Sequence, residues 1–273
     1  MFRSMGSAVS TRPGEIQWEW ASDETTKAEP APSAPPPAPA APGTTAPEAS
    51  SPYRAELIDG TKLASEVLAT VKRGVDAIAA AAAAEGAAAA PPRLVVVLVG
   101  ANSASLSYIK RKTKAAADCG IDATTRELPA ETSQAEVLAL VGELNGDDAV
   151  HGVIVQLPLP AHLHAPDVTN AIAPHKDVDG FTPPNIGGVA LEGHEPLFCP
   201  CTPKGCLQLI KSVRTMADRG ATPLRGLEAC VIGASNIVGM PMALLLMREG
   251  CTVTVCHIDT VDPASDTCCF SHA

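Results

Sequence analysis

Residues 93–120 read RLVVVLVGANSASLSYIKRKTKAAADCG, and this stretch decides the fold. Its first part, Leu94–Val99, is a continuous apolar run of branched side chains, which predicts a strand buried on both faces. Gly100 breaks the run, and a helix is expected to follow as far as about Cys119. The candidate N-cap residues of that helix are Asn102, Ser103 and Ser105.

The expected helix carries two chemically useful side chains on one face. Tyr108 and Lys112 are four residues apart, so their side chains project from the same side of a helix. In an open parallel sheet, ligands bind beyond the carboxyl ends of the strands. This strand-to-helix junction is expected to place Ser105, Tyr108 and Lys112 near the carboxyl ends of the strands. The sequence therefore predicts a binding or catalytic site there.

Strand and helix patterns alternate through the following hundred residues, which indicates parallel β-α-β units. Further strands are expected at Ala123–Leu128, whose polar content suggests a sheet edge, and at Val150–Leu159. Apolar residues at helical spacing predict a helix before the first strand, with Thr61 as its cap. Two more helices are expected from Glu131 to about Asn145, with Thr132 or Ser133 as cap, and from Pro166 to Ile172.

A second β-α-β pattern lies near the end of the chain. A helix is expected to open at PCTPKGC, with Thr202 as cap and Pro203 at its first position. Then come the strand Gly226–Ile232, the tight turn GASNIVGMP, a helix to Met247 and the strand Thr252–Cys256. This order is typical of a dinucleotide-binding domain, although Gly233 and Ser235 do not satisfy the simple G-x-G-x-x-G pattern.

The predicted fold is therefore α/β. It has a three-layer catalytic domain with a mostly parallel sheet (53–203), followed by an incomplete Rossmann-like nucleotide-binding domain (204–273). Residues 1–52 are expected to form a disordered tail, because nine of the 25 prolines lie between Pro30 and Pro52 among Ala, Ser, Thr and Gly.

Composition excludes several classes of function. A net charge of −10 argues against nucleic acid as a partner, and no run of about 18 apolar residues is present to span a membrane. Nine cysteines without a signal peptide favour a reducing compartment. Cys199, Cys201 and Cys206 lie close in sequence, but they lack a second pair or a histidine motif at ligand spacing, so no metal site is expected.

Two polar features allow either a structural or a functional interpretation. Gln156 is a lone polar residue at the carboxyl end of an apolar strand, so it is either a satisfied core amide or a site residue. Asp177 and Asp179 lie two apart in the Gly- and Pro-rich segment PHKDVDGFTPPN, where Asp is also common as a turn residue.

Taken together, the motifs resemble the bifunctional methylenetetrahydrofolate dehydrogenase/methenyltetrahydrofolate cyclohydrolases of one-carbon metabolism. The resemblance runs from about Ile58 to His257. It rests on five segments in the same order and at similar spacing: VGANSASLSYIKRKTKAAADCGI, HGVIVQLPLP, KDVDGF, PCTPKGC and VIGASNIVGMPMALLL.

This resemblance implies roles for the matching residues. Lys112 corresponds to the catalytic lysine, Tyr108 to the residue that stacks on the substrate, and Gln156 to the residue that orients the lysine. Asp179 would hold the pterin ring, and Leu157 would line the folate site. The implied cofactor is NADP, held at the turn that contains Gly233, Ala234, Ser235, Ile237 and Gly239.

The implied chemistry is oxidation of 5,10-methylenetetrahydrofolate to the 5,10-methenyl form, and hydrolysis of that form to 10-formyltetrahydrofolate. The first step is a hydride transfer, for which the protein mainly positions folate against nicotinamide. The second step delivers water to a cationic carbon. A desolvated lysine with a lowered pKa can handle the proton of that step as a general acid or base.

Three departures from the family pattern concern the cofactor. Ala234 replaces the usual arginine of the phosphate turn, and Ile258 and Asp259 replace a hydroxyl and a frequent base after the next strand. All three changes disfavour a 2′-phosphate, and an acid near this position can bind a ribose hydroxyl, as in NAD-specific proteins. The sequence therefore predicts a weakened or absent preference for NADP over NAD.

Two other interpretations accompany the resemblance. The chain ends soon after the second strand of the nucleotide domain, so a truncated, non-catalytic relic that binds folate or a full-length partner is the alternative. A short-chain dehydrogenase also carries Tyr-x-x-x-Lys, but there the glycine-rich turn precedes that pair, whereas here Gly233 follows it. The resemblance further implies a homodimer, and a cytoplasmic location with mitochondrion and plastid left open.

Overall fold

The computed structural model describes residues 57–86, 90–100, 103–213 and 219–260, together with two short strands near the start of the chain. These two, β1 (Ala8–Val9) and β2 (Gln17–Trp18), pair antiparallel. The chain divides into two units between Ile58 and Asp59. Apart from β1 and β2, the predicted disordered tail at 1–52 lies outside the described residues.

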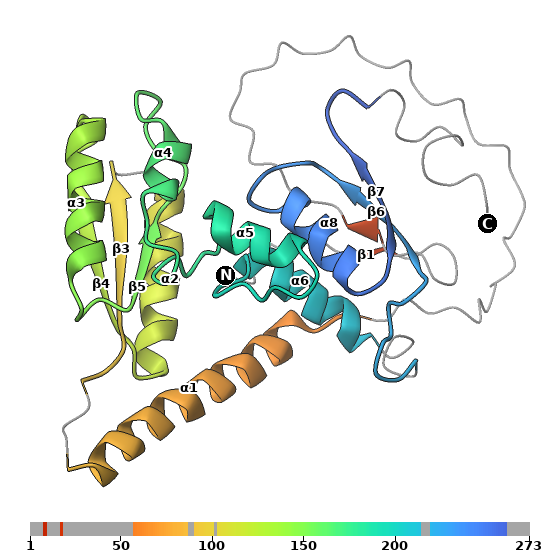
Figure 1. Cartoon of the computed structure of the whole chain (residues 1–273), viewed down its shortest axis with the longest axis horizontal. Helices are drawn as coiled ribbons and strands as arrows, with labels where there is room; N and C mark the ends of the chain where they lie inside the picture. The colour runs from red at the N-terminus through yellow and green to blue at the C-terminus, as the bar shows by residue number, and fades with distance from the viewer. Residues whose placement is uncertain are drawn as a thin grey trace, which may run out of the picture. The chain divides into compact units, whose positions relative to one another are not determined.

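The first sheet has three parallel strands in the order β4-β3-β5 (Figure 1). They are β3 (Arg93–Val99), β4 (Asp122–Leu128) and β5 (Gly152–Val155). Leu94 of the central strand pairs with Ala123 on one side and with Gly152 on the other. The prediction that the polar strand lies at a sheet edge is confirmed. The third strand is shorter than the predicted range 150–159.

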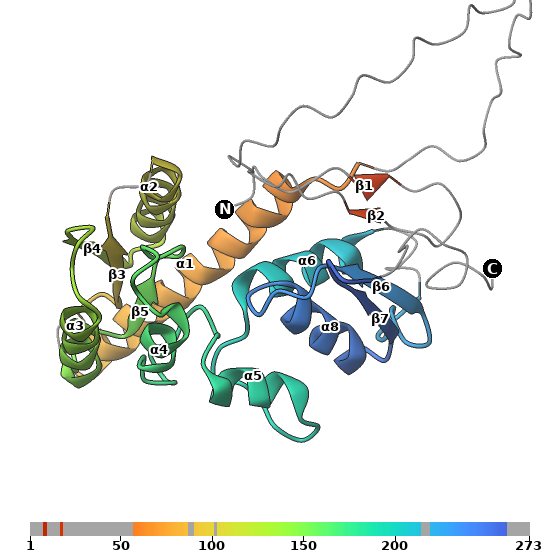
Figure 2. The same ribbon diagram turned by 90° about the horizontal axis from the view of Figure 1, so that it is seen from above.

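Helices cover both faces of this sheet, which makes three layers. Val95, Val97 and Val99 pack on one face against α3 (Gln134–Gly146) and α4 (Ala165–Asn170). On the other face, Val96 and Leu98 pack against Ile109 of α2 (Ser103–Asp118). Figure 2 shows α2 and α3 on opposite sides of the strands. Alternate residues of β3 face opposite helices, so both sets of side chains are buried. Burial of each Val side chain stabilises the folded state by about 1.5–3 kcal/mol.

Local signals set the helix ends in this part of the chain. Ser133 caps α3 in a capping box with Glu136, which confirms one of the two predicted caps. Gly120 ends α2 with φ +82°, a conformation that glycine adopts without strain. Of the cap candidates for α2, Asn102 and the Ser103 side chain lie outside the described residues. Ser105 is 4% exposed inside the helix and is therefore a packing residue.

Helix α1 (Gly60–Ala84) precedes β3 and is capped differently from the prediction. Its N-cap is Asp59, whose Oδ1 accepts hydrogen bonds from the amides of Thr61 and Lys62, both at 3.0 Å. The assignment of Thr61 as the cap was therefore wrong. A carboxylate at the first position accepts from two free amides and also complements the helix dipole.

Two helices follow the first sheet, and sequence reasoning missed one of them. Helix α5 (Pro183–Ala190) was not among the predicted helices, and its first residues, Pro183 and Pro184, belong to the Gly- and Pro-rich segment PHKDVDGFTPPN. Both prolines occupy the first turn, where a missing N–H costs little. Helix α6 (Cys201–Ser212) begins at Cys201 after Pro200, so the prediction of Thr202 as cap was wrong, and Pro203 is its third residue instead of its first.

The second sheet has the predicted β-α-β order. Strands β6 (Glu228–Ile232) and β7 (Thr252–Cys256) pair in parallel, and α8 (Gly239–Arg248) connects them. Arg248 at the end of α8 donates to the carbonyl oxygen of Gly188 at 2.9 Å and to Glu195 at 2.6 Å. These contacts fix α8 against α5 and against the segment that follows α5. In the described part of the chain, no helix combines the length and apolarity needed to cross a bilayer.

Candidate functional site

Helix α2 presents Tyr108 and Lys112 on the face predicted from their spacing. Ile109, between them in sequence, is 6% exposed and packs on the sheet, which fixes the rotation of the helix. With the helix held this way, Tyr108 is 37% exposed and Lys112 is half-buried. A phenol ring and an amine therefore project from one face of α2, the helix that follows β3.

Gln156 follows β5 and carries an unsatisfied buried acceptor. Its backbone amide continues the ladder to the carbonyl oxygen of Val97 at 2.9 Å, and its Nε2 donates to the carbonyl oxygen of Leu157 at 2.7 Å. Its Oε1 is buried, and no group in the described part of the chain donates to it. A buried acceptor without a donor costs about 1–3 kcal/mol, so this atom is set up to receive a donor from a ligand or a mobile side chain.

Asp179 comes into electrostatic contact with Lys112. Burial raises the pKa of the Asp179 carboxyl above its ordinary value of 3.8, the nearby Lys112 ammonium opposes that shift, and Asp177 adds to it. Only groups close in space act on one another in this way. The loop after β5 and the helix after β3 therefore bring an acid and a base to the same edge of the sheet.

Cys201 also belongs to this group of residues, and sequence reasoning missed it. Its Sγ donates to the carbonyl oxygen of Val178 at 3.5 Å. Desolvation of the thiol, reinforced by the Asp179 carboxyl, raises the pKa of Cys201 to about 11 against the opposing effect of Lys112 and Lys204, although the residue as a whole is exposed. The sequence interpretation treated this cysteine only as a metal-ligand candidate, although it lies in the quoted segment PCTPKGC. The described residues contain no cluster of three or more His, Cys, Asp or Glu side chains suited to a metal ion.

The turn between β6 and α8 has the geometry of a phosphate-binding turn. Gly233 adopts φ +108°, and a Cβ at Gly239 would collide with the Gly233 carbonyl oxygen, so both positions require glycine. The Oγ of Ser235 accepts hydrogen bonds from the amides of Val238 at 3.2 Å and Gly239 at 3.3 Å. The backbone approaches itself closely here, immediately before the N-terminus of α8, which is the position of the glycine-rich turn in dinucleotide-binding folds.

The remaining residues of the turn are accessible to a ligand. Ala234 is half-buried and Ile237 is 41% exposed. Beyond β7, the amide of Asp259 donates to Nδ1 of His257 at 3.1 Å, while the Asp259 carboxylate is 87% exposed. An exposed carboxylate directly after the second strand is where a dinucleotide-binding fold binds ribose hydroxyls.

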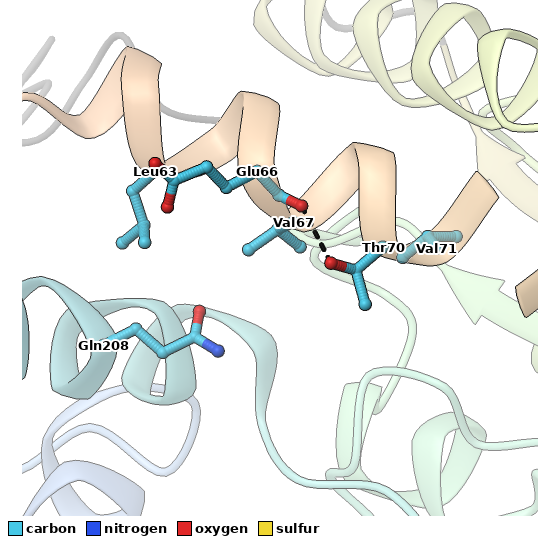
Figure 3. A pocket seen from close by; sticks show the side chains of 6 residues that line it. All are labelled: Leu63, Glu66, Val67, Thr70, Val71 and Gln208. Atoms are coloured by element: carbon cyan, nitrogen blue, oxygen red, sulfur yellow. Dashed lines mark hydrogen bonds between the residues drawn. The ribbon is translucent and has the colours of Figure 1, made fainter. Parts of the chain in front are cut away.

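A separate hollow lies between α1 and α6 (Figure 3). It measures about 270 Å³ and is lined by Leu63, Glu66, Val67, Thr70, Val71 and Gln208. It contains none of the predicted site residues. Among its lining residues only Glu66 carries a charge, and the hydroxyl of Thr70 donates to the Glu66 carbonyl oxygen at 2.9 Å. The chemistry of the molecule is therefore concentrated at the sheet edge and not in this hollow.

Comparison with known families gives two matches that follow one another along the chain. Residues 58–179 match the family model of the tetrahydrofolate dehydrogenase/cyclohydrolase catalytic domain. Residues 200–268 match the model of the NAD(P)-binding domain of the same family.

Individual relatives agree with these matches. The chain is 48% identical over 211 residues to the bifunctional protein FolD of Gluconacetobacter diazotrophicus, an alignment that covers 77% of this chain and 63% of the relative. It is 41% identical over 214 residues to bifunctional protein FolD 2 of Arabidopsis thaliana, with coverages of 78% and 67%. The chain thus spans about two thirds of the length of these curated relatives.

Solved structures show the same likeness. The bifunctional FolD enzyme of Campylobacter jejuni superposes with a TM-score of 0.65 at 41% identity, covering 75% of this chain and 67% of that one. The Trypanosoma brucei dehydrogenase-cyclohydrolase, solved with NADP and an inhibitor, gives 0.67 at 32% identity, with coverages of 76% and 65%.

Proposed function

Because this chain belongs to the tetrahydrofolate dehydrogenase/cyclohydrolase family, we propose that it interconverts one-carbon derivatives of tetrahydrofolate. It oxidises 5,10-methylenetetrahydrofolate to the methenyl form with a nicotinamide cofactor, and hydrolyses the methenyl form to 10-formyltetrahydrofolate. The observation that carries this proposal is the unpartnered Gln156 Oε1 at the edge where Lys112 and Asp179 meet.

In this proposal the folate lies over the carboxyl ends of β3 and β5. Tyr108 offers its exposed ring to the flat pterin and aminobenzoyl groups, and Leu157 contributes an apolar contact. The Asp179 carboxylate accepts hydrogen bonds from the N–H groups of the pterin. Together they hold the bridging carbon near Lys112, which is the positioning that a hydride transfer requires.

Lys112 handles the proton of the hydrolytic step. Water adds to the cationic methenyl carbon and loses a proton, and N5 of the folate gains one as the bridge opens. The Lys112 nitrogen takes that first proton and returns it to N5 as the C–N5 bond breaks. The remaining hydroxyl proton leaves to solvent as the formyl carbonyl forms, so the step releases one proton overall, which balances the lost positive charge, and leaves the lysine unchanged. The Gln156 Oε1, to which no described residue donates, would accept a hydrogen bond from the lysine nitrogen when folate binds, and this bond would orient the lysine and satisfy the buried amide oxygen.

The turn at Gly233, Ala234, Ser235, Ile237 and Gly239 would hold the dinucleotide. When bound, NADP or NAD supplies the hydride acceptor. The close approach of Gly233 and Gly239 leaves space for the pyrophosphate, and Asp259 is placed to bind a ribose hydroxyl. We propose that Ala234, Ile258 and Asp259 weaken the preference for NADP over NAD. In this proposal, residues 53–203 form the folate-binding domain and residues 204–273 the nucleotide-binding domain.

A spectroscopic assay tests the proposal directly. The purified chain is mixed with 5,10-methylenetetrahydrofolate and NADP or NAD, and the absorbance of the methenyl product is followed as it forms and then decays. Both phases are expected; both should depend on Tyr108, which positions the folate, and the decay phase should depend most on Lys112. Folate binding without either phase would favour the non-catalytic interpretation, and absence of folate binding would overturn the assignment.

The cellular compartment and the oligomeric state of the protein are also part of the proposal. Cys119, Cys199, Cys201, Cys206 and Cys251 carry free thiols, which supports a reducing compartment such as the cytoplasm. A homodimer stays a prediction from the family resemblance. Sedimentation of the purified chain measures it.

A further inference from the structure

We propose that Asp177 and Asn185 form a buried positioning element that sets the orientation of Asp179, and through it the affinity for folate, without contacting the substrate. The inference rests on the folate-binding function proposed above. It concerns two side chains, each 1% exposed, that the proposed mechanism does not use.

The carboxylate of Asp177 binds the backbone of the residues that follow Asp179. Its Oδ1 accepts a hydrogen bond from the amide of Gly180 at 3.0 Å, and its Oδ2 accepts one from the amide of Thr182 at 2.8 Å. Both donors follow Asp179 in sequence, so the backbone is folded tightly around that residue. Charge-assisted bonds to backbone amides are among the stronger hydrogen bonds in proteins, and this loop is therefore rigid.

Asn185 links this loop to the segment that carries Cys201. Its Nδ2 donates to Asp177 Oδ2 at 2.9 Å and to the carbonyl oxygen of Pro174 at 3.1 Å. Its Oδ1 accepts from the amide of Phe198 at 3.2 Å. One buried amide thus fixes both ends of the 174–182 loop region to the chain just before Cys201.

Lys176 anchors the same loop from the opposite side. It is 5% exposed, and its Nζ donates to the carbonyl oxygens of Leu144 at 3.0 Å and Asp147 at 2.7 Å, at the C-terminal end of α3. Its own carbonyl oxygen accepts from the amide of Val153 in β5 at 2.8 Å. A cation at a helix C-terminus is favoured by the helix dipole, so the loop is held to both the sheet and α3.

Close backbone packing makes the position of Asp179 sensitive to this network. Gly180 has φ +72°, and a Cβ there would lie 2.8 Å from the carbonyl carbon of Cys199 and from the nitrogen of Pro200. The two segments therefore touch through their backbones next to Asp179. A shift of either segment moves the Asp179 carboxylate out of the position in which it holds folate, so the loss should appear mainly in folate affinity.

The test compares Asp177→Asn with Val141→Ala. The first variant keeps the size of the side chain but turns an N–H group toward backbone donors. Val141 is 0% exposed in the core on α3 and makes none of the Asp177 hydrogen bonds, so its truncation lowers stability through a core cavity and leaves those bonds in place. The probe is 5,10-methenyltetrahydrofolate, with affinity and hydrolysis both measured. We expect Asp177→Asn to raise the folate KM about 10- to 100-fold with a smaller change in kcat, and Val141→Ala to change neither.

The outcomes separate this inference from the proposed function. If the unmodified protein does not bind methenyltetrahydrofolate, the proposed function fails. If the unmodified protein binds it and the two variants behave alike, the positioning role is overturned. Asn185→Ala leaves Asp177 its two backbone donors, so it should raise the KM by a smaller factor.

Amide hydrogen exchange tests the same inference on the unmodified protein and does not depend on the folding of any variant. The amides of Gly180 and Thr182 should exchange with solvent as slowly as the amides of β3, with or without folate, because the network is complete before the ligand binds. Fast exchange that slows only when folate is added would overturn a preformed positioning element.

Discussion

Burial raises the pKa of the Asp179 carboxyl, and the Lys112 ammonium, which reaches the same place from helix α2, opposes that shift. The two groups come from separate elements and meet at the carboxyl edge of the sheet. An acid that is costly to ionise and a cation that favours its ionisation are therefore coupled. Folate binding, proton transfer and pH dependence should all respond to changes in this pair.

The first prediction concerns the lysine. Lys112→Gln should reduce hydrolysis of methenyltetrahydrofolate about 100- to 10,000-fold, the usual contribution of a general acid or base, and should reduce its formation much less. The two phases of the methenyl absorbance measure this directly. Lys110→Gln removes an exposed charge from the same helix and should leave both phases intact. Equal losses in both phases would contradict a role confined to the proton step.

The second prediction concerns pH. Because the pKa of Asp179 is raised, its carboxylate takes up a proton at a higher pH than a free Asp side chain, so folate affinity should fall as the pH drops through a value above 3.8. In Asp179→Asn this acid limb should disappear and affinity should be low at every pH. A binding titration across pH 3.5–7 measures both; an unchanged acid limb in the variant would assign it to another group.

The contribution of Asp179 to folding stability should change with pH in the opposite direction to its contribution to folate affinity. A raised pKa means that the folded chain binds the Asp179 proton more tightly than the unfolded chain does. This contribution to stability is present below the unfolded pKa and is lost as the pH rises through the folded pKa. Denaturant unfolding of Asp179→Asn should therefore show less loss of stability over that interval than the unmodified protein, even though the variant binds folate poorly.

A third prediction concerns the thiol of Cys201. With a pKa of about 11, only about one molecule in a thousand carries the thiolate at pH 8. Alkylation by iodoacetamide should be slow there and should accelerate about tenfold per pH unit. Peptide mapping follows the modified residue, and Cys201→Ser identifies its signal. Rapid alkylation at pH 7 would contradict the raised pKa of this thiol.

A fourth prediction concerns the choice of cofactor. If Asp259 binds a ribose hydroxyl, dehydrogenase rates with NAD should equal or exceed those with NADP. Asp259→Asn should lower the efficiency with NAD about tenfold, as expected for a lost charged hydrogen bond, and should affect NADP less. Glu228→Gln, an exposed acid at the start of β6, is the control. Strong selectivity of the unmodified protein for NADP would refute the prediction.

The last prediction concerns the capping box of α3. Ser133→Ala removes the hydroxyl that accepts from the Glu136 amide and should lower the free energy of unfolding by about 1 kcal/mol. The pKa of Glu136 is lowered by its hydrogen bonds to the Ser133 side chain and backbone, so part of this loss should vanish in acid as the carboxylate is protonated. Ser107→Ala, exposed on α2, is the control in the same unfolding experiments.

The sequence by itself determined the elements whose signals lie within a few residues. The branched run Leu94–Val99 predicted a strand buried on both faces, Ser133 predicted a cap, and the four-residue spacing of Tyr108 and Lys112 placed both on one helix face. Backbone hydrogen bonding and side-chain period act locally, so these features do not depend on the rest of the chain.

Only the tertiary structure decided which polar residues are structural and which are available for chemistry. Asp177 and Asp179 look alike in sequence, yet the first is enclosed by three N–H donors and the second is left beside Lys112. Gln156 is not a fully satisfied amide, because its Oε1 has no donor among the described residues. Sheet order and loop packing bring distant segments together, and the partners of a buried polar atom depend on that arrangement and not on the neighbouring residues.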